Sequence, residues 1–332
     1  MNKLKYLKNI NLRAFDGTLH TNVTTADGMT AEMKTYYDEM LIHAAEPNLV
    51  HNQFGQKRNI PQGNGKTIEF RKFEQFPKAL TPLTEGVTPD GRSMQVTSVT
   101  ATVEQYGDYV AISDVLEQTA IDPVVVEATK ALGSQAGRTL DTVVREVMNA
   151  GTNVQYAEGQ VTSRSELTTA HKLTVKAVKM AVRTLKNANA SKRDGDYIGI
   201  IHPDIAFDLT DDPEWKYPHQ YVDTEEIYRG EIGRIAGVRF VETTEAKCFG
   251  AVGASGASVY STLILGDNAY GITEINGGGM QTIIKQKGSA GTADPLNQRS
   301  TVGWKAGLVA KILSDEYMVR IETGCSNDGA AN

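Results

Sequence analysis

Residues 62–112 have the sequence QGNGKTIEFRKFEQFPKALTPLTEGVTPDGRSMQVTSVTATVEQYGDYVAI, and this stretch decides how the chain is organised. Thr67–Phe73 is an extended run, and apolar and polar residues alternate from Val99 to Glu104, as in a half-buried strand. Prolines and glycines mark the long connection between these runs, at Pro77, Pro82, Gly86, Pro89 and Gly91. The pattern predicts an elongated β-hairpin whose second strand lies within Gln95–Ile112. Such a hairpin is marginal alone, so we expect it to lie across a neighbouring subunit.

The strongest predicted helix follows at residues 122–150. Asp122 is a favourable N-cap, Pro123 suits the first helical position, and Asn149–Gly151 ends the helix with C-cap chemistry. The helix carries an apolar stripe, formed by Ala128, Leu132, Ala136, Leu140, Val143, Val144 and Val147. Gly133 and Gly137 each cost about 1 kcal/mol relative to alanine in a helix. We therefore expect another element to pack closely against the glycine side.

Towards the N-terminus, Thr30–Ala45 has the spacing of an amphipathic helix that Pro47 ends. It has no core of its own, so it must pack on another part of the molecule. Residues 1–28 are polar and carry early basic residues, at Lys3, Lys5, Lys8 and Arg13. They indicate either a mobile tail or a basic arm that touches a polyanion.

The second half alternates between helices and strands. A helix is predicted through Val175–Leu185, a buried strand at Tyr197–Ile201, and a short helix that starts at His202–Asp204 and runs to Leu209. Further strands are predicted at Val238–Val241, Leu263–Leu265, Gly271–Glu274 and Gln281–Lys285. The last two runs, Thr301–Leu313 and Glu316–Glu322, are predicted to form a hairpin. The fold class is α+β, with helices beside a mixed or antiparallel sheet.

Composition excludes several classes of protein. The chain has 332 residues, 40% of them hydrophobic and 22% charged, with a formal net charge of −6. These values are ordinary for a globular protein and argue against extensive disorder and against a dedicated DNA-reading domain. The chain contains no apolar run of about 20 residues. Its first fifteen residues lack the apolar block of a secretory signal, so we expect no export by that route. These exclusions leave a globular or assembling protein that acts inside a cell.

Gly63–Thr67 resembles the end of a phosphate-binding loop. The complete motif requires a glycine where the chain has Ile60, and it requires a helix after the loop. A strand is predicted instead, which favours a turn that opens the hairpin. A nucleotide-dependent enzyme that uses Lys66 stays the alternative.

Three other clusters have plain structural interpretations. Gly253–Ala257 lacks the final glycine of a nucleophile elbow, which favours a flexible loop. His202–Asp204 follows a strand, where enzymes often place catalytic groups, but a His and an Asp there more often cap a helix. The acidic clusters Asp211–Glu214 and Asp223–Glu226 could gather a hard cation, but they lack the spacing of a calcium loop and favour solvated surface.

The remaining candidates are also structural. Asp294–Arg299 predicts a turn that sets the register of a strand anchored by Trp304. Cys248 and Cys325 lack the spacing of a zinc site and are predicted to be reduced thiols. We expect no catalytic residue, no cofactor-binding residue and no metal ligand, and this argues against an enzyme.

Several stretches, in order along the chain, carry a resemblance to a known family. They are Phe54–Arg58, Gly63–Phe70, Ala79–Val87, Gln105–Tyr109, Ala120–Pro123, Thr139–Asp141, His202–Asp204 and Gln298–Trp304. Together they resemble the major capsid proteins of tailed phages with the HK97-like fold, specifically the coat family typified by coliphage N-four. The resemblance extends from about Thr30 to Thr323.

The resemblance implies an HK97-like α+β fold with four parts. An N-terminal arm with its helix would occupy residues 1–60, and an extended loop made of a long β-hairpin would occupy residues 61–105. A peripheral domain would comprise residues 106–170 and 301–332, with the spine helix at 122–150. An axial domain would comprise residues 171–300.

The resemblance also implies a function. Subunits would assemble into hexamers and pentamers that form the icosahedral head shell around phage DNA, with the portal and with possible separate scaffold and decoration proteins as partners. Contact with DNA would be non-specific and on the inner face, no membrane would be involved, and the virion would be assembled in the host cytoplasm. An encapsulin-like compartment shell is the alternative within this fold. About 28 residues precede the first helix, which we expect to be too few for a scaffolding segment, and Lys66, Lys72 and Lys78 are expected to be solvated lysines rather than cross-linking groups.

Overall fold

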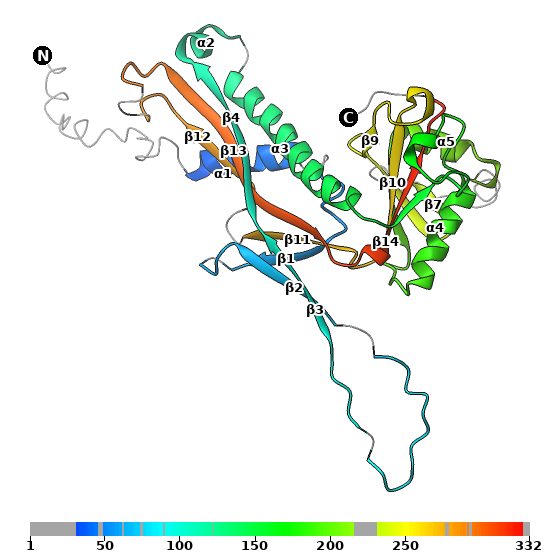
Figure 1. The fold of residues 1–332 in the computed structure, drawn as a ribbon. Coiled ribbons are helices and arrows are strands. Elements are labelled where there is room, and N and C mark those ends of the chain that lie inside the picture. The colour runs from blue at the N-terminus through cyan, green and yellow to red at the C-terminus, as the bar shows by residue number, and fades with distance from the viewer. Residues whose placement is uncertain are drawn as a thin grey trace, which may run out of the picture.

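The computed structural model has two lobes and a long loop that projects away from both (Figure 1). It describes residues 31–45, 49–61, 63–73, 76–88, 90–121, 123–215, 231–275, 279–289, 291 and 294–327. Among the helices within these ranges, none is both long and apolar enough to cross a lipid bilayer. The expected basic arm at Lys3–Arg13 and the acidic cluster Asp223–Glu226 lie outside the described residues.

The first lobe is built on a sheet that continues along one long strand, β13 (Arg299–Ile312). β13 pairs antiparallel with β4 (Glu104–Ser113), β12 (Gln281–Lys285) and β11 (Tyr270–Ile275), and β1 (Gln56–Ile60) is parallel to β11. The short helix α2 (Asp114–Thr119) follows β4 at the far end of the lobe (Figure 1). Apolar residues at every second position of β13 are buried, so one face of this sheet packs on the core.

The long helix α3 (Val124–Asn149) lies along this sheet, and α1 (Ala31–Ala45) packs on α3. The predicted close packing at the two glycines is confirmed. A Cβ atom at Gly133 would lie 2.7 Å from the carbonyl oxygen of Leu41, and one at Gly137 would lie 2.5 Å from that of Ala45. The glycines therefore let the backbone of α1 lie directly on α3.

The start of α3 differs from the expectation. The helix begins at Val124, and Pro123 is the N-cap residue rather than the first helical residue. Asp122, the expected cap, lies outside the described residues. The helix ends at Asn149 with Ala150 as its C-cap, within the predicted Asn149–Gly151 segment.

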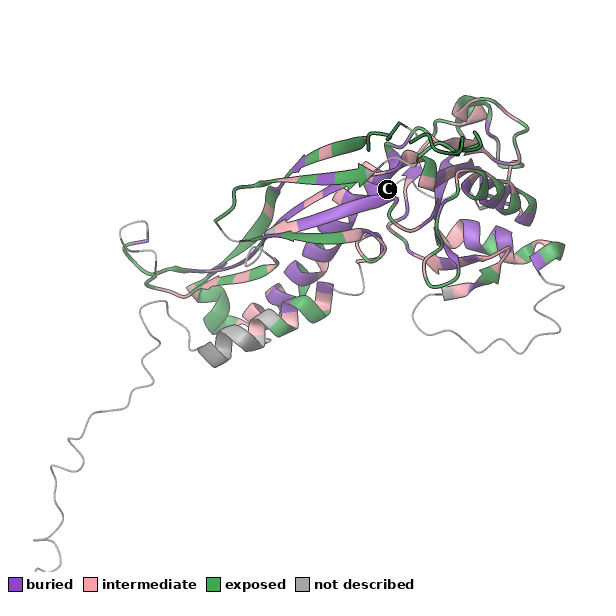
Figure 2. Cartoon of the chain, turned by 90° about the horizontal axis from the view of Figure 1, so that it is seen from below, coloured by how far each residue is buried: buried purple, intermediate pink, exposed green. Residues whose placement is uncertain are grey.

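The second lobe is a mixed sheet in the order β5-β14-β10-β6-β8-β7. Its strands are β5 (Val154–Tyr156), β14 (Met318–Thr323), β10 (Val259–Leu265), β6 (Tyr197–Ile201), β8 (Val238–Glu242) and β7 (Glu231–Ile235), with β9 (Cys248–Phe249) on β10. Side chains from α4 (Val175–Asn187) and α5 (Pro203–Asp211) share one core with this sheet. Figure 2 shows buried residues on both the strands and the helices of the two lobes. The predicted α+β class is confirmed.

The predicted C-terminal hairpin is wrong. β13 and β14 do not pair with each other, because a 3₁₀ turn at Asp315–Tyr317 carries the chain from the first sheet into the second. β13 lies against α3, whereas β14 pairs antiparallel with β10. Two adjacent extended runs look the same in sequence whether they pair with each other or with distant strands.

Strands also cross the segment boundaries that the resemblance implied. β11 and β12, within the segment expected for the axial domain, belong to the first sheet, and β5 and β14, expected in the peripheral domain, belong to the second. The single strand predicted within Gln95–Ile112 is two strands, β3 (Val96–Thr102) and β4, with different partners. Strand partners depend on contacts between residues far apart in the chain, which local patterns do not report.

Candidate assembly surfaces

The projecting loop begins as an antiparallel pair of β2 (Thr67–Phe73) with β3. Phe70 anchors this pair on the first lobe, because a Cβ at Gly271 of β11 would lie 2.7 Å from the Phe70 ring. Ala101 and Val103 are buried beside it, and the amide of Val103 donates to the carbonyl of Lys66 at 2.8 Å. The base of the loop is therefore fixed to the body.

Beyond Phe73 and before Val96, the described residues of the loop form no strand, and their side chains are exposed. Large apolar side chains are among them: Phe76, Leu80, Leu83, Val87 and Met94. Figure 1 shows this part of the loop pointing away from both lobes. Exposed apolar side chains gathered on one element mark an interaction surface.

A second exposed apolar group lies at the far end of the first lobe. It comprises Val115 and Leu116 of α2, Ile121 just after it, and Leu296 in the turn before β13. The amide of Asp114 donates to the carbonyl of Gln298 at 2.9 Å, which ties α2 to that turn. α2 has no buried residue, so its apolar side chains do not contribute to the core of the chain.

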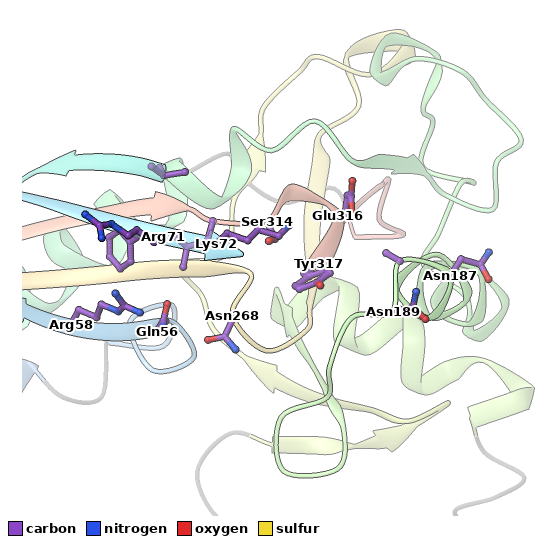
Figure 3. Close-up of a pocket in the computed structure, with 14 residues that line it drawn as sticks. Gln56, Arg58, Arg71, Lys72, Asn187, Asn189, Asn268, Ser314, Glu316 and Tyr317 are labelled. Atoms are coloured by element: carbon purple, nitrogen blue, oxygen red, sulfur yellow. The ribbon is translucent and has the colours of Figure 1, made fainter. Parts of the chain in front are cut away.

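A cleft of about 620 Å³ separates the base of the loop from the second lobe (Figure 3). Arg58, Arg71 and Lys72 come from the loop side, and Asn187 and Asn189 come from the end of α4. Arg71 pairs with Glu69 at 3.1 Å, and the Lys72 ammonium lies 5.2 Å from the centre of the Tyr317 ring. The lining combines these polar and charged side chains with apolar ones, among them Phe70, Val99 and Leu313.

A buried hydrogen-bonded contact fixes the segment after α1 to the middle of α3. The Asp141 carboxylate accepts the backbone amide of His51 at 2.7 Å and lies 2.5 Å from its Nδ1. The Tyr270 hydroxyl donates to the carbonyl of His51 at 2.5 Å. Sequence patterns missed this pair, since 90 residues separate its members.

The glycine-rich sequence before β2 is a turn. Gly63 and Gly65 have φ values of +89° and +80°, and the amide of Asn64 donates to the carbonyl of Pro61 at 3.2 Å. A strand follows, so no helix N-terminus faces Lys66, which is exposed. Lys72 and Lys78 are also exposed, and Lys72 lies at the edge of the cleft. The interpretation as a turn that opens the hairpin is confirmed.

His202–Asp204 caps a helix, as expected. His202 is the N-cap of α5, where its Nδ1 accepts the amide of Asp204 at 3.2 Å. Burial lowers the pKa of His202, and the nearby Asp204 charge opposes this in part. The Asp204 carboxylate accepts from the Tyr260 hydroxyl at 3.0 Å.

The other candidates are also tied into local structure. Asp212 accepts the amide of Val175 at 3.0 Å, and Glu214 lies 2.5 Å from the Lys179 ammonium. Ser255 is in a 3₁₀ turn at Ala254–Gly256, which the Ala254 amide joins to the carbonyl of Leu167.

The predicted turn before β13 is confirmed. The amide of Asn297 donates to the carbonyl of Asp294 at 3.1 Å, and the Asp294 carboxylate accepts the amide of Arg299 at 2.8 Å. Trp304 is buried under α3, where its indole donates to Gln135 at 3.3 Å. Cys248 and Cys325 are free and buried, and burial raises the pKa of Cys325 to about 12.

Comparisons with known proteins identify the family. Residues 96–321 match the model of a family described as phage capsid protein. No curated protein was found to match.

Solved structures of phage capsids share the fold. The capsid of Ralstonia phage GP4 is similar with a TM-score of 0.66 and 14% identity, over 85% of this chain and 90% of that chain. Cyanophage Pam1 gives 0.64 and 15%, over 80% and 87%, and cyanophage P-SCSP1u gives 0.63 and 13%, over 83% and 88%. The fold is therefore that of HK97-like capsids, as the sequence resemblance implied. The family match covers more than half of the chain, which therefore belongs to the phage capsid protein family and serves as a major capsid protein, the subunit that forms the head shell.

Proposed function

We propose that this capsid subunit assembles into rings of six and of five in which the extended loop of each copy lies over its neighbour. The observation that carries the proposal is the row of apolar side chains on the loop, which its own chain leaves exposed. Burying apolar surface contributes roughly 25 cal/mol per Å², so covering these side chains favours association. The anchor at Phe70 supports the proposal, because a fixed base directs the loop towards one neighbour.

The two lobes have different roles in this proposal. The first lobe, with α3 as its spine helix, is the peripheral domain, and the second lobe is the axial domain that meets its copies at the ring centre. The strand pairing supports revised boundaries, with β11 and β12 in the peripheral domain and with β5 and β14 in the axial domain.

The sequence resemblance supports a more specific proposal for the coat family, the partners and the place of assembly. We assign the chain to the coat family typified by coliphage N-four, with copies of itself, the portal, and possible separate scaffold and decoration proteins as partners. The net charge of −6 supports non-specific contact with packaged DNA, since few neutralised phosphates hold the genome weakly. The protein acts as a structural component rather than an enzyme, and it joins the virion in the host cytoplasm.

Shortening the loop tests the proposal. In one variant, residues 76–94 are replaced by a Gly-Gly turn, which leaves the β2–β3 pair and its Phe70 anchor in place. The variant and the full chain are each produced alone and together with the phage's other head proteins. They are compared by gel filtration and negative-stain electron microscopy. The full chain is expected to form rings, tubes or closed particles, whereas the variant stays a folded monomer with an unchanged far-UV circular dichroism spectrum. Assembly of the variant to the same extent as the full chain would contradict the proposal.

A further inference from the structure

One stretch of the second lobe is basic throughout. Between Glu166 and Asp194 the chain contains no acidic residue. The same stretch carries seven basic residues: Lys172, Lys176, Lys179, Arg183, Lys186, Lys192 and Arg193. Because the whole chain has a formal net charge of −6, this stretch concentrates positive charge in an otherwise acidic protein.

Four of these residues form a row along α4, and all four are exposed: Lys176, Lys179, Arg183 and Lys186. At about 3.6 residues per turn and about 1.5 Å per residue, they lie within an arc of about 80° along a row about 15 Å long. The other side of the helix is apolar and is buried in the core of the second lobe. Packing of that apolar side therefore turns the basic row to solvent.

The row lies on the side of the second sheet that points away from α3. On β6, Tyr197 and Ile201 share a core with α4, whereas Ile198 and Ile200 point the other way and share a core with α3. Figure 1 shows α4 on the side of the second lobe away from α3. The first lobe therefore does not cover the basic row.

Acidic neighbours pair with the N-terminal end of the row. The Lys176 ammonium lies 2.8 Å from Glu158, and that of Lys179 lies 2.5 Å from Glu214. Both lysines are more than half exposed, and exposed ion pairs of this kind contribute at most about 1 kcal/mol. These lysines can therefore exchange their partners for other anions.

The C-terminal end of the row keeps its charge. Arg183, Lys186 and Lys192 are exposed, and none of them forms an ion pair with a residue that the structure describes. Two acidic residues lie near Lys192: Asp194 follows it in the turn, and the amide of Asp267 donates to the carbonyl of Ser191 at 2.8 Å. We call the exposed residues Lys176, Lys179, Arg183, Lys186 and Lys192 the basic face.

The chemistry of the basic face suits a phosphate backbone better than a protein partner. Protein interfaces concentrate apolar and aromatic side chains at their centre and are depleted in lysine. None of the large apolar side chains that the described chain exposes lies between Lys172 and Arg193. A basic row along one helix is the electrostatic footprint of a nucleic-acid-binding surface, and Arg, Lys and Asn side chains are common phosphate ligands. The exposed Asn187 and Asn189 continue the row at the end of α4 (Figure 3).

We infer that the basic face contacts the backbone of packaged DNA, with Arg183, Lys186 and Lys192 as its main phosphate ligands, and that this side of the second lobe lines the interior of the shell. At about 3.4 Å per nucleotide of one strand, the row on α4 spans about four nucleotides. Each subunit neutralises few phosphates, so the contact is weak and independent of base sequence. The inference rests on the proposed function and adds to it the surface that touches the genome.

Chemical footprinting of lysines tests the contact in the virion. Heads filled with DNA and heads emptied by osmotic shock are treated briefly with a small amine-acetylating reagent, and acetylation is measured by mass spectrometry. Lys186 and Lys192 are expected to react at least threefold more slowly in filled heads. Lys130 on α3 and Lys305 on β13, both exposed, are the controls and are expected to react equally in the two preparations. Equal reaction of Lys186 and Lys192 in filled and emptied heads would overturn the inference.

Charge reversal tests the same face in unassembled subunits. Arg183→Glu, Lys186→Glu and Lys192→Glu are combined, and fluorescence anisotropy measures binding to a short DNA duplex over a range of salt concentrations. Binding is expected to weaken at least tenfold at low salt. The slope of log K against log salt is expected to become shallower by about 2.7, because each phosphate contact contributes about 0.9. A second duplex of unrelated sequence is expected to bind the natural chain within threefold of the first.

The matched control combines Lys130→Glu, Lys285→Glu and Lys305→Glu, which gives the same net charge outside the second lobe. It is expected to bind DNA within threefold of the natural chain. Circular dichroism and urea unfolding check that both variants fold, and the milder pair Arg183→Gln with Lys186→Gln gives a second measurement, with an expected loss of at least threefold. Equal loss of binding in the control, or no binding by the natural chain at low salt, would overturn the inference.

The outcomes separate this inference from the proposed function. Heads that assemble and package DNA but show no protection of the basic face would overturn the contact while the ring proposal stands. Failure of the natural chain to assemble even with the phage's other head proteins would instead count against the ring proposal.

Discussion

The long helix α3 and the tip of the extended loop both carry rows of large apolar side chains, but only those of α3 are covered within the described chain. Leu132 of α3 is 3% exposed, whereas Leu83 of the loop is 78% exposed. The helix shares a core with β13, while the loop projects from the body without a partner (Figure 1). The same residue type therefore stabilises the subunit at one position and is available to join subunits at the other.

Changes along α3 are expected to lower the free energy of unfolding, whereas changes at the loop tip are expected to spare it and to affect assembly. The boundary between these behaviours lies at the base of the loop, where Phe70 is buried and Phe76 is exposed.

The largest loss of stability is expected at the buried contact on α3. Asp141→Ala leaves the backbone amide and the Nδ1 of buried His51 without their acceptor. Each unsatisfied buried group typically costs about 1–3 kcal/mol, so we expect a loss of about 4 kcal/mol. Urea unfolding measures the change. Glu127→Ala on the same helix removes an exposed ion pair with Lys130 and is expected to change stability by less than about 1 kcal/mol. Equal effects of the two substitutions would show that the His51 contact does not hold the N-terminal segment to α3.

Two phenylalanines of the same hairpin, one buried and one exposed, give the most direct test of this difference. Phe70 is 3% exposed and Phe76 is 57% exposed. Phe70→Ala is expected to cost about 3 kcal/mol, as for a buried aromatic side chain, and Phe76→Ala to change stability by less than about 0.5 kcal/mol. Thermal and urea unfolding measure both, and sedimentation then measures assembly. A large loss of stability in Phe76→Ala would mean that the loop packs on its own chain.

A smaller effect is expected where α1 lies on α3. Gly137→Ala gains about 1 kcal/mol of helix propensity but places a methyl group 2.5 Å from the carbonyl oxygen of Ala45. Overpacking of this kind costs typically 1–3 kcal/mol, so we expect a net destabilisation of about 1 kcal/mol. Lys130→Ala, on the exposed side of α3, is the control and is expected to be nearly neutral. Stabilisation by Gly137→Ala would indicate that α1 does not seat on this glycine.

The smallest effect is a pH dependence in the second lobe. Burial lowers the pKa of His202 in the folded chain, so the unfolded chain takes up the proton first as the pH falls below about 6.5. The contribution of His202 is therefore present above that pH and is lost as the pH falls through the lower, folded value. His202→Asn keeps a side-chain acceptor at the N-cap of α5 without this titration. Between pH 7 and pH 5 it is expected to lose less stability than the natural chain, and an equal loss in chemical denaturation would contradict this.

Much of the fold follows from local patterns. The 3.6-residue stripe predicts α3 to within two residues at its start and one at its end, and the pair Gly133 and Gly137 correctly predicts a close neighbour. Runs such as Tyr197–Ile201 are apolar throughout and become strands that are buried on both faces. Prolines and glycines between Phe73 and Val96 predict a connection that carries no regular structure.

Local patterns cannot supply the partners of those elements. The cleft beside the loop base needs Arg58, Lys72 and Asn187 from three separate elements, and the Asp141 contact needs His51 from 90 residues away. For the same reason β13 and β14, adjacent in sequence, entered different sheets. Periodicity and turn chemistry act between residues a few positions apart, so the amino-acid sequence shows where the helices, the strands and the long loop lie. The tertiary structure decides which apolar surfaces are buried, because the burial of an apolar face depends on which distant surface it meets. In this chain the apolar stripe of α3 packs into the core, whereas the apolar side chains of the extended loop stay exposed.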